Sequence, residues 1–196
     1  MKLKLTLAFA LTALLATSLA ADKKLPDGKS LLPADTMKAA RRNVGPKPSG
    51  EIKTVDVEGQ PFKQAIRVAV KEVPENPWTV QVSTLTAADV KEGDVVLASF
   101  WARCVESKAA GPKAEFLVYF GIPEGGVEHS IAQELSIGAK WTKVQVPARV
   151  VADYASGKAM LNLDFGYAVQ TVEVADLKLT NYARAVKLEE LPSSGF

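Results

Sequence analysis

Apolar and polar residues alternate over many short windows of this chain, and that alternation limits the folds open to it. Ile66, Val68 and Val70 fall on one side of such a window, with Arg67 and Lys71 on the other. Because successive side chains of a β-strand point to opposite faces of a sheet, this pattern predicts strands with one buried face. Gly, Pro and charged residues separate the windows and predict turns. The pattern predicts strands at about 52–57, 66–70, 80–83, 95–103, 115–120, 131–137, 142–146, 158–165 and 171–181.

No window carries the longer period of an extended amphipathic helix. So many short strands must pair into two packed sheets or a closed barrel to bury their apolar faces. Of these, we predict an all-β fold in which two antiparallel sheets form a β-sandwich. With 47% hydrophobic and 23% charged residues, the 196-residue chain can bury one core of ordinary size.

The first residues are typical of a secretory signal peptide. Lys2 and Lys4 precede an apolar stretch, and Ser18 and Ala20 supply the small residues that a signal peptidase needs. The stretch is shorter than the ~20 apolar residues of a membrane span, although a retained anchor is the alternative. We therefore predict a signal peptide at 1–20 and a protein that is secreted or periplasmic, in the cell envelope.

The rest of the chain divides by composition. Residues 21–50 are rich in Pro, Gly and charge, which is typical of a leader or linker, with a short helix at 35–41 capped by Asp35. The β-sandwich is expected to occupy 51–184, followed by a C-terminal tail at 185–196.

Composition also bears on function. Lys and Arg number 24 against 22 Asp and Glu, which gives no electrostatic reason to expect nucleic acid or an anionic membrane as partner. Cys104 is the single cysteine, so an exported fold depends on its core and not on disulfides, and we interpret Cys104 as a packed small hydrophobic residue. One Cys and one His are too few for a zinc site. We predict no cofactor; no acidic loop has calcium spacing, so a structural calcium is left unassigned.

Three blocks of sequence follow one another in an order known from one family. They are 93–103 (GDVVLASFWAR), 141–147 (WTKVQVP) and 165–182 (FGYAVQTVEVADLKLTNY). Together they resemble the jelly-roll carbohydrate-binding modules that accompany secreted xylanases, over about residues 62–182. The resemblance implies a galactose-binding-domain-like jelly roll without catalysis of its own. It also implies a plant or algal polysaccharide, xylan or β-glucan like, as ligand, and we expect the chain to act alone or with a separate glycoside hydrolase.

Aromatic and amide side chains at outward positions are candidates for sugar binding. Pyranose rings present C–H faces to aromatic rings and hydroxyls to planar polar groups. In 95–103 the alternation assigns Trp101 and Arg103 to the face opposite the core, and Gln81 faces outward by the same rule. We predict that Trp101, Arg103 and Gln81 share one concave surface. The alternative is that Trp101 packs beneath a loop and Arg103 pairs with a carboxylate.

Trp78, Tyr167 and Gln170 complete the predicted binding residues. Trp78 follows a proline at a loop-to-strand corner, where its ring either projects over a sheet edge or plugs the core. Gly166 permits a close approach of backbone or ligand. We predict Tyr167 and Gln170 at the rim of the groove, the alternative being a hydrogen-bonded corner. Trp141 is interpreted as a structural residue that closes the end of the sandwich.

The sequence does not predict an enzyme, but it leaves glycoside hydrolysis open. His129 lies in a turn-like segment beside Ser130, which does not make a triad, and we interpret it as a solvated loop residue. A glycosidase needs two carboxylates across one bond, and these cannot be paired from sequence; Asp164 is better suited to accept hydrogen bonds in a groove. If the chain is a small hydrolase, we expect two carboxylates that converge in the groove, one of them with a raised pKa. An envelope structural or protein-interaction module predicts instead an exposed apolar patch or open sheet edge.

Overall fold

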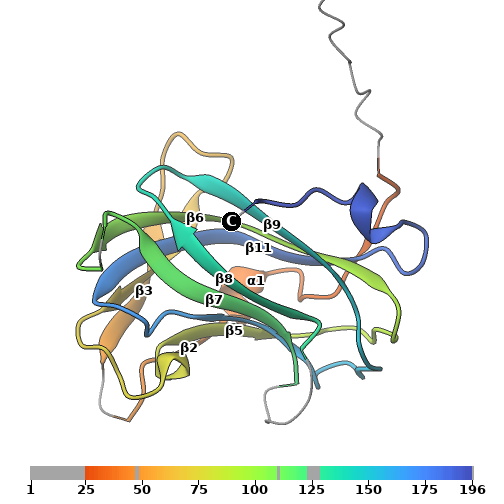
Figure 1. The fold of residues 1–196 in the computed structure, drawn as a ribbon, viewed down its shortest axis with the longest axis horizontal. Helices are drawn as coiled ribbons and strands as arrows, with labels where there is room; N and C mark the ends of the chain where they lie inside the picture. The colour runs from red at the N-terminus through yellow and green to blue at the C-terminus, as the bar shows by residue number, and fades with distance from the viewer. Residues whose placement is uncertain (1–24, 47–48, 110, 123–128, 196) are drawn as a thin grey trace, which may run out of the picture.

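The computed structural model describes residues 25–46, 49–109, 111–122 and 129–195, and in them two antiparallel β-sheets stack face to face (Figure 1). The strands of the six-stranded sheet are β1 (Lys29–Ser30), β3 (Gly50–Asp56), β4 (Gln64–Val70), β6 (Val95–Ser107), β9 (Thr142–Arg149) and β11 (Gln170–Asn181). Those of the five-stranded sheet are β2 (Arg41–Asn43), β5 (Gln81–Leu85), β7 (Ala114–Gly121), β8 (Ile131–Ile137) and β10 (Met160–Asp164). Three short helices are α1 (Thr36–Ala39), η1 (Pro77–Thr79) and η2 (Leu188–Glu190).

Strand order shows that each sheet is assembled from distant segments. The six-stranded sheet runs β3-β4-β11-β6-β9 with β1 beside β11, and the five-stranded sheet runs β2-β5-β10-β7-β8. Most strands that pair within a sheet are therefore not consecutive in the sequence, as a jelly roll requires. Among the described residues, no helix has the length and apolar character that a membrane crossing needs.

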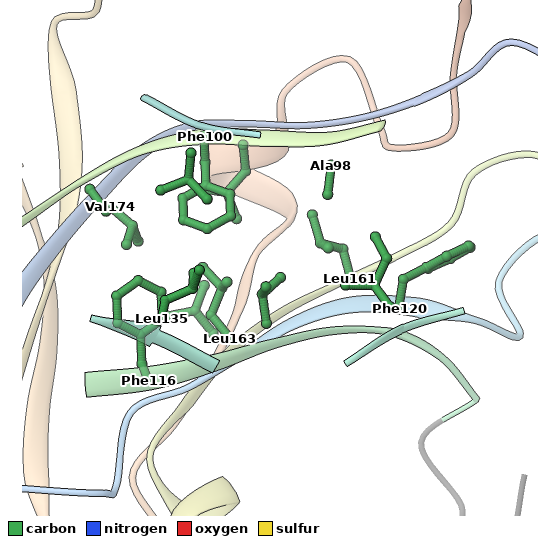
Figure 2. Close-up of a cluster of buried hydrophobic side chains, with 14 of the residues drawn as sticks. Ala98, Phe100, Phe116, Phe120, Leu135, Leu161, Leu163 and Val174 are labelled. Carbon is green, nitrogen blue, oxygen red and sulfur yellow. The ribbon is translucent and has the colours of Figure 1, made fainter. Parts of the chain in front are cut away.

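The core fills the space between the sheets. Figure 2 shows Ala98 and Phe100 projecting from one sheet toward Phe116 and Leu163 of the other. The ring centroids of Phe100 and Phe116 are 6.3 Å apart, and Phe116 stacks on Phe165 at 5.0 Å. These side chains are almost fully buried, which explains the period-two alternation of the strands that carry them. The prediction of an all-β, two-sheet antiparallel sandwich is confirmed.

Each predicted strand is present in the structure, some with shifted ends. The predicted strand at 131–137 has the same bounds as β8, whereas β6 and β9 run farther than predicted. Cys104 is 4% exposed in the core, as predicted, and burial raises the pKa of its thiol.

The sandwich begins earlier than the predicted boundary at residue 51. β1 pairs with β11 and β2 pairs with β5, while Leu31 and Leu32 between them are buried in the core. α1 lies inside the predicted helix, and Asp35 Oδ1 accepts a hydrogen bond from the Lys38 backbone N–H at 3.0 Å. The linker interpretation is therefore wrong for residues 29–43. The sequence did not reveal β1 and β2 because strands this short show no alternation. The predicted signal peptide at 1–20 lies outside the described residues.

The C-terminal tail is docked along the six-stranded sheet. Val186 and Leu191 pack with Val95 and Leu97 in a small apolar cluster. Farther on, the Ser194 N–H donates to the Gln145 carbonyl of β9 at 2.9 Å.

Candidate functional site

The outer face of the six-stranded sheet is centred on a buried ion cluster. Glu173 of β11 is fully buried and lies in register between Arg67 of β4 and Arg103 of β6. Arg67 Nε donates to Glu173 Oε1 at 2.8 Å, and Arg103 Nε donates to Oε2 at 2.7 Å. Both carboxylate oxygens are thus satisfied within the chain. For Arg103 the structure shows the alternative, pairing with a carboxylate.

Three aromatic rings lie beside that ion cluster. Phe62, in the segment between β3 and β4, packs against Trp101 with centroids 6.0 Å apart and against Trp141 at 4.9 Å. The Arg103 guanidinium sits over the Trp141 ring at 4.9 Å. Trp101 therefore packs against a loop residue, again as in the alternative. Trp141 packs on the outer face of the six-stranded sheet, and its predicted role in closing the end of the sandwich stays a prediction.

The outer face of the five-stranded sheet carries a different set of side chains, which we call the polar face. It consists of Gln81 and Ser83 of β5, Asn162 and Asp164 of β10, Tyr119 of β7 and Glu134 of β8. These residues alternate along their strands with core residues such as Val82, Leu161 and Leu163. Asn162 pairs in register with Ser83 and Tyr119, and Asp164 pairs with Gln81 and Leu117.

The prediction that Trp101, Arg103 and Gln81 share one surface is wrong. Trp101 and Arg103 lie on the outer face of the six-stranded sheet, and Gln81 lies on the outer face of the other. Alternation along a strand tells outward from inward, but it does not tell which sheet the strand joins. Whether each of these three residues binds a ligand stays a prediction.

Asn162 and Asp164 form the buried centre of the polar face. They are 0% and 4% exposed, and Asn162 Nδ2 donates to Asp164 Oδ1. The Asn162 Oδ1 atom is buried and has no hydrogen-bond partner in the described part of the chain. Burial raises the pKa of Asp164 to about 6, against the opposing effect of the Asn162 hydrogen bond. The centre of this face thus holds an unpaired acceptor beside a desolvated carboxyl group.

Sequence reasoning did not select Asn162. Its signal is the segment Leu161-Asn162-Leu163-Asp164, in which an amide and a carboxylate take the outward positions of a strand that is buried on both faces. Polar groups buried in this way require hydrogen-bond partners, so they mark either a structural network or a ligand.

Trp78 and Tyr167 lie at one end of the polar face and are both exposed. The two residues are 57% and 39% exposed. The Gly166 N–H donates to the Pro77 carbonyl at 3.1 Å, which ties the Tyr167 turn to the Trp78 turn. Gln81 Nε2 donates to the Trp78 carbonyl at 2.6 Å. A Cβ at Gly166 would lie 2.6 Å from that Pro77 oxygen, so this close approach requires glycine.

Tyr167 also lines a hollow of about 650 Å³. Its other lining residues are Lys113, Glu115, Phe116, Gln133, Glu134, Leu135, Ser136 and Gly195. Burial raises the pKa of the Tyr167 hydroxyl, and the nearby charges of Asp164 and Glu134 raise it further. Tyr167 is thus close to both carboxylates of the polar face, in a space large enough for a sugar unit.

Gln170 does not lie at a rim, so that prediction is wrong. It is 2% exposed, and its Nε2 donates to the Glu115 carbonyl at 2.6 Å and the Phe165 carbonyl at 2.8 Å. Its Oε1 accepts from the Glu115 N–H at 2.8 Å. The side chain is fully used to join β11 of one sheet to β7 of the other, the structural alternative for this corner.

His129 is likewise not a solvated loop residue. Its ring stacks on Tyr119 with centroids 4.7 Å apart, and its Nδ1 is buried with no partner among the described residues. Burial, and after it the charge of Asp164, raises the pKa of Tyr119 to about 12. Tyr119 is therefore a neutral phenol whose ring is fixed by His129 at the edge of the polar face.

No cluster of three or more His, Cys, Asp or Glu side chains among the described residues could hold a metal ion.

Solved structures share this fold at low sequence identity. The CBM22-1 xylan-binding domain of Xyn10C from Paenibacillus barcinonensis is 14% identical, over 82% of this chain and 99% of that domain, with a TM-score of 0.52. A structure described as CBM4 is 13% identical over 71% of this chain and 83% of its own, with a TM-score of 0.51. The CBM22-1-GH10 modules of Clostridium thermocellum xylanase 10B, complexed with xylohexaose, match 82% of this chain and 28% of theirs at 11% identity, with a TM-score of 0.51.

These comparisons define the class of fold. The chain has the jelly-roll sandwich of the carbohydrate-binding modules, so the resemblance carried by the three sequence blocks is confirmed at the level of the fold. No family model and no curated protein matches the sequence.

Proposed function

We propose that this chain is an exported, non-catalytic carbohydrate-binding module that holds a polysaccharide on its polar face. The observation that carries the proposal is the buried, unpaired Asn162 Oδ1 beside Asp164. An acceptor desolvated without a partner costs about 1–3 kcal/mol, and a donor from a ligand offsets that cost. On the opposite sheet the buried Glu173 has its hydrogen bonds within the chain, so it needs no ligand.

The ligand class follows from the chemistry of the face. Sugar hydroxyls can donate to the Asp164 carboxylate and, where the ligand displaces the atoms that cover it, to Asn162 Oδ1; Gln81 lies next to Asp164 in register. Trp78 and Tyr167 offer exposed rings on which pyranose C–H faces stack. We infer a neutral polysaccharide of the xylan or β-glucan kind, in keeping with the xylan-binding and xylohexaose-bound structures that share the fold.

Location and partner belong to the same proposal. The basic, apolar and small-residue pattern at the N-terminus supports export to the periplasm or beyond. Modules of this fold occur beside a catalytic domain in xylanase 10B, which supports a separate glycoside hydrolase as a partner that shares the polysaccharide.

Affinity electrophoresis on xylan and on a soluble β-glucan, with calorimetry on xylohexaose and cellohexaose, tests the proposal. We expect the wild-type chain to bind one of these, and Trp78→Ala and Tyr167→Ala each to weaken binding by about two- to tenfold, since an aromatic contact contributes about 0.5–1.5 kcal/mol. Val105→Ala, an exposed apolar residue of the other sheet, is the control. Failure of the wild-type chain to bind any of the four, or full binding by both variants, would overturn it.

One observation favours hydrolysis as a second candidate. Asp164 and Glu134 both pair in register with Leu117, so they lie two strand spacings apart, about 10 Å by strand geometry. Inverting glycosidases hold their carboxyls nearly that far apart and raise the pKa of one of them, as burial does for Asp164. Release of reducing ends from the bound polysaccharide, abolished by both Asp164→Asn and Glu134→Gln, would establish hydrolysis in place of binding alone.

A further inference from the structure

We propose a second ligand site, on the outer face of the six-stranded sheet, that binds the anionic group of an acidic saccharide. It is formed by Lys53, Arg67 and Arg103 around Glu173, which we call the basic row. The basic row lies on the sheet opposite the polar face, and it does not depend on the function proposed for that face.

Strand register aligns the basic row. Lys53 of β3 pairs with Arg67 of β4, Arg67 pairs with Glu173 of β11, and Glu173 pairs with Arg103 of β6. Lys53 also contacts Glu51, which in turn contacts Lys71. The group therefore holds four cations and two carboxylates within one face. The excess positive charge is complementary to an anion.

The two arginines keep hydrogen-bond donors free. Arg67 uses its Nε and Nη2 on Glu173, and Arg103 uses only its Nε. In the described part of the chain, Arg67 Nη1 and both terminal nitrogens of Arg103 have no partner. The two side chains are 36% and 35% exposed, so solvent reaches part of each. A guanidinium binds carboxylate or sulfate oxygens with paired N–H donors.

The buried carboxylate holds both guanidinium groups in place. Glu173 is fully buried, and each of its oxygens binds one arginine. Arg103 is further fixed by its position over the Trp141 ring. Donors that are ordered before binding lose little side-chain entropy when a ligand arrives. The basic row is therefore prepared for an anion.

Adjacent rings favour a saccharide over an acidic peptide. Trp141 lies against Arg103, and Phe62 contacts both Trp141 and Trp101; all three rings are only partly buried. Aromatic ring faces accept the C–H face of a pyranose, while the arginines take its charged substituent. A uronate carboxylate and a sulfate ester present the same chemistry, so both are probes for the site.

Calorimetry with oligogalacturonate and with a sulfated galactan oligosaccharide tests the proposal, with poly-glutamate and xylohexaose as comparisons. We expect wild-type binding to at least one anionic saccharide, and a loss of at least about tenfold in Arg103→Gln, since a charge-assisted hydrogen bond contributes about 1.5–3 kcal/mol. In this variant Glu173 Oε1 keeps its two contacts from Arg67 but Oε2 loses its Arg103 donor, so circular dichroism must first show that the fold is intact. Lys53→Gln, which does not touch Glu173, should weaken binding in the same direction.

Lys158→Gln is the matched control, because it removes one exposed positive charge from a turn next to the five-stranded sheet. If Lys158→Gln weakens binding of the anionic saccharide as much as Arg103→Gln does, the loss of binding reflects net charge alone and the proposal is overturned. Poly-glutamate binding as strong as that of both saccharides would do so too, and would assign the row to an acidic protein segment. No wild-type binding to either anionic saccharide would likewise end it.

The two sites can fail separately. Arg103→Gln should leave any xylohexaose binding unchanged, and a variant of the polar face such as Asn162→Val should leave binding of the anionic saccharide unchanged. Loss of both ligands in either variant would show that the two faces are not independent, against this proposal.

Discussion

Single residues of the polar face are not optimised for stability. Asp164 is 4% exposed, and its pKa of about 6 shows that its environment disfavours the charged form. Asn162, beside it, carries an acceptor without a partner. Residues that cost stability in this way are typical of binding sites.

Asp164→Asn should therefore stabilise the protein at neutral pH. Folding raises the pKa of the Asp164 carboxyl group from 3.8 to about 6. The contribution of the protonated carboxyl group to the free energy of unfolding is therefore fully present below pH 3.8 and is lost as the pH rises through about 6. Removing the charge should raise the free energy of unfolding at pH 8 by about 3 kcal/mol, because each pKa unit between 3.8 and about 6 corresponds to about 1.36 kcal/mol. At pH 3.5 the two proteins should be nearly equal. Urea denaturation at both pH values measures this difference, and a variant less stable at pH 8 would contradict it.

Asn162→Val should separate binding from stability. Valine suits a buried strand and removes the unpaired acceptor, but it also removes the Nδ2 donor of Asp164. These two effects are similar in size and opposite in sign, so we expect the free energy of unfolding to change by less than about 1 kcal/mol. Polysaccharide binding should fall at least about tenfold, because the central acceptor is lost.

Denaturant melts and affinity electrophoresis on the same preparation give both values for Asn162→Val. A large loss of stability would show that Asn162 is structural. Unchanged binding would remove it from the site.

At the level of strands, alternation predicted most of the elements and the face of each residue. Phe100 is inward and Trp101 outward, as the pattern of 95–103 indicates. Two short strands, β1 and β2, escaped detection because two or three residues cannot show a period. Sheet membership also escaped, since Gln81 and Trp101 are both outward but belong to different sheets.

Gln170 shows how one side chain joins two elements. Gln170→Ala removes three hydrogen bonds and leaves the backbone groups of Glu115 and Phe165 without a partner in a buried region. We expect a loss of about 2–4 kcal/mol in the free energy of unfolding. Gln133→Ala, whose amide bonds an exposed carbonyl, should lose less than 1 kcal/mol by the usual size of surface effects, about 0.5 kcal/mol. Chemical denaturation compares the two, and equal losses would contradict the bridging role.

For the whole molecule, the start of the domain is the main correction to the sequence interpretation. Residues 29–43 look like linker in composition, yet they place two strands and two buried leucines in the sandwich. The composition of a segment indicates only whether it could form a core by itself. Here Leu31 and Leu32 are buried by strands that lie far along the chain.

A chain that starts at residue 51 should thus be much less stable than one that starts at residue 25. It lacks Leu31 and Leu32, each worth about 2–5 kcal/mol in the core, together with the pairing of β2 on the edge of β5. Heating followed by circular dichroism should show a lower, broader transition in the shorter chain. Leu31→Ala in the longer chain is the milder comparison. Identical transitions for the two chains would restore the boundary at 51.

The candidate site was predictable in part. Trp78 and Tyr167 were selected from aromatic type and turn context, and the structure exposes both at the polar face. Asn162 was missed and Gln170 was misplaced, because a linear pattern does not reveal which buried amide is satisfied. That difference depends on contacts between strands that only the fold brings together.

The three tryptophans divide unevenly between the two sides of the sandwich, one beside the polar face and two beside the basic row. Trp78 is mostly in water, whereas Trp101 and Trp141 are partly covered, so a collisional quencher such as acrylamide should reach the first indole sooner than the others. Single-tryptophan versions of the chain would then carry a built-in optical label on one chosen side, with no need for an attached dye.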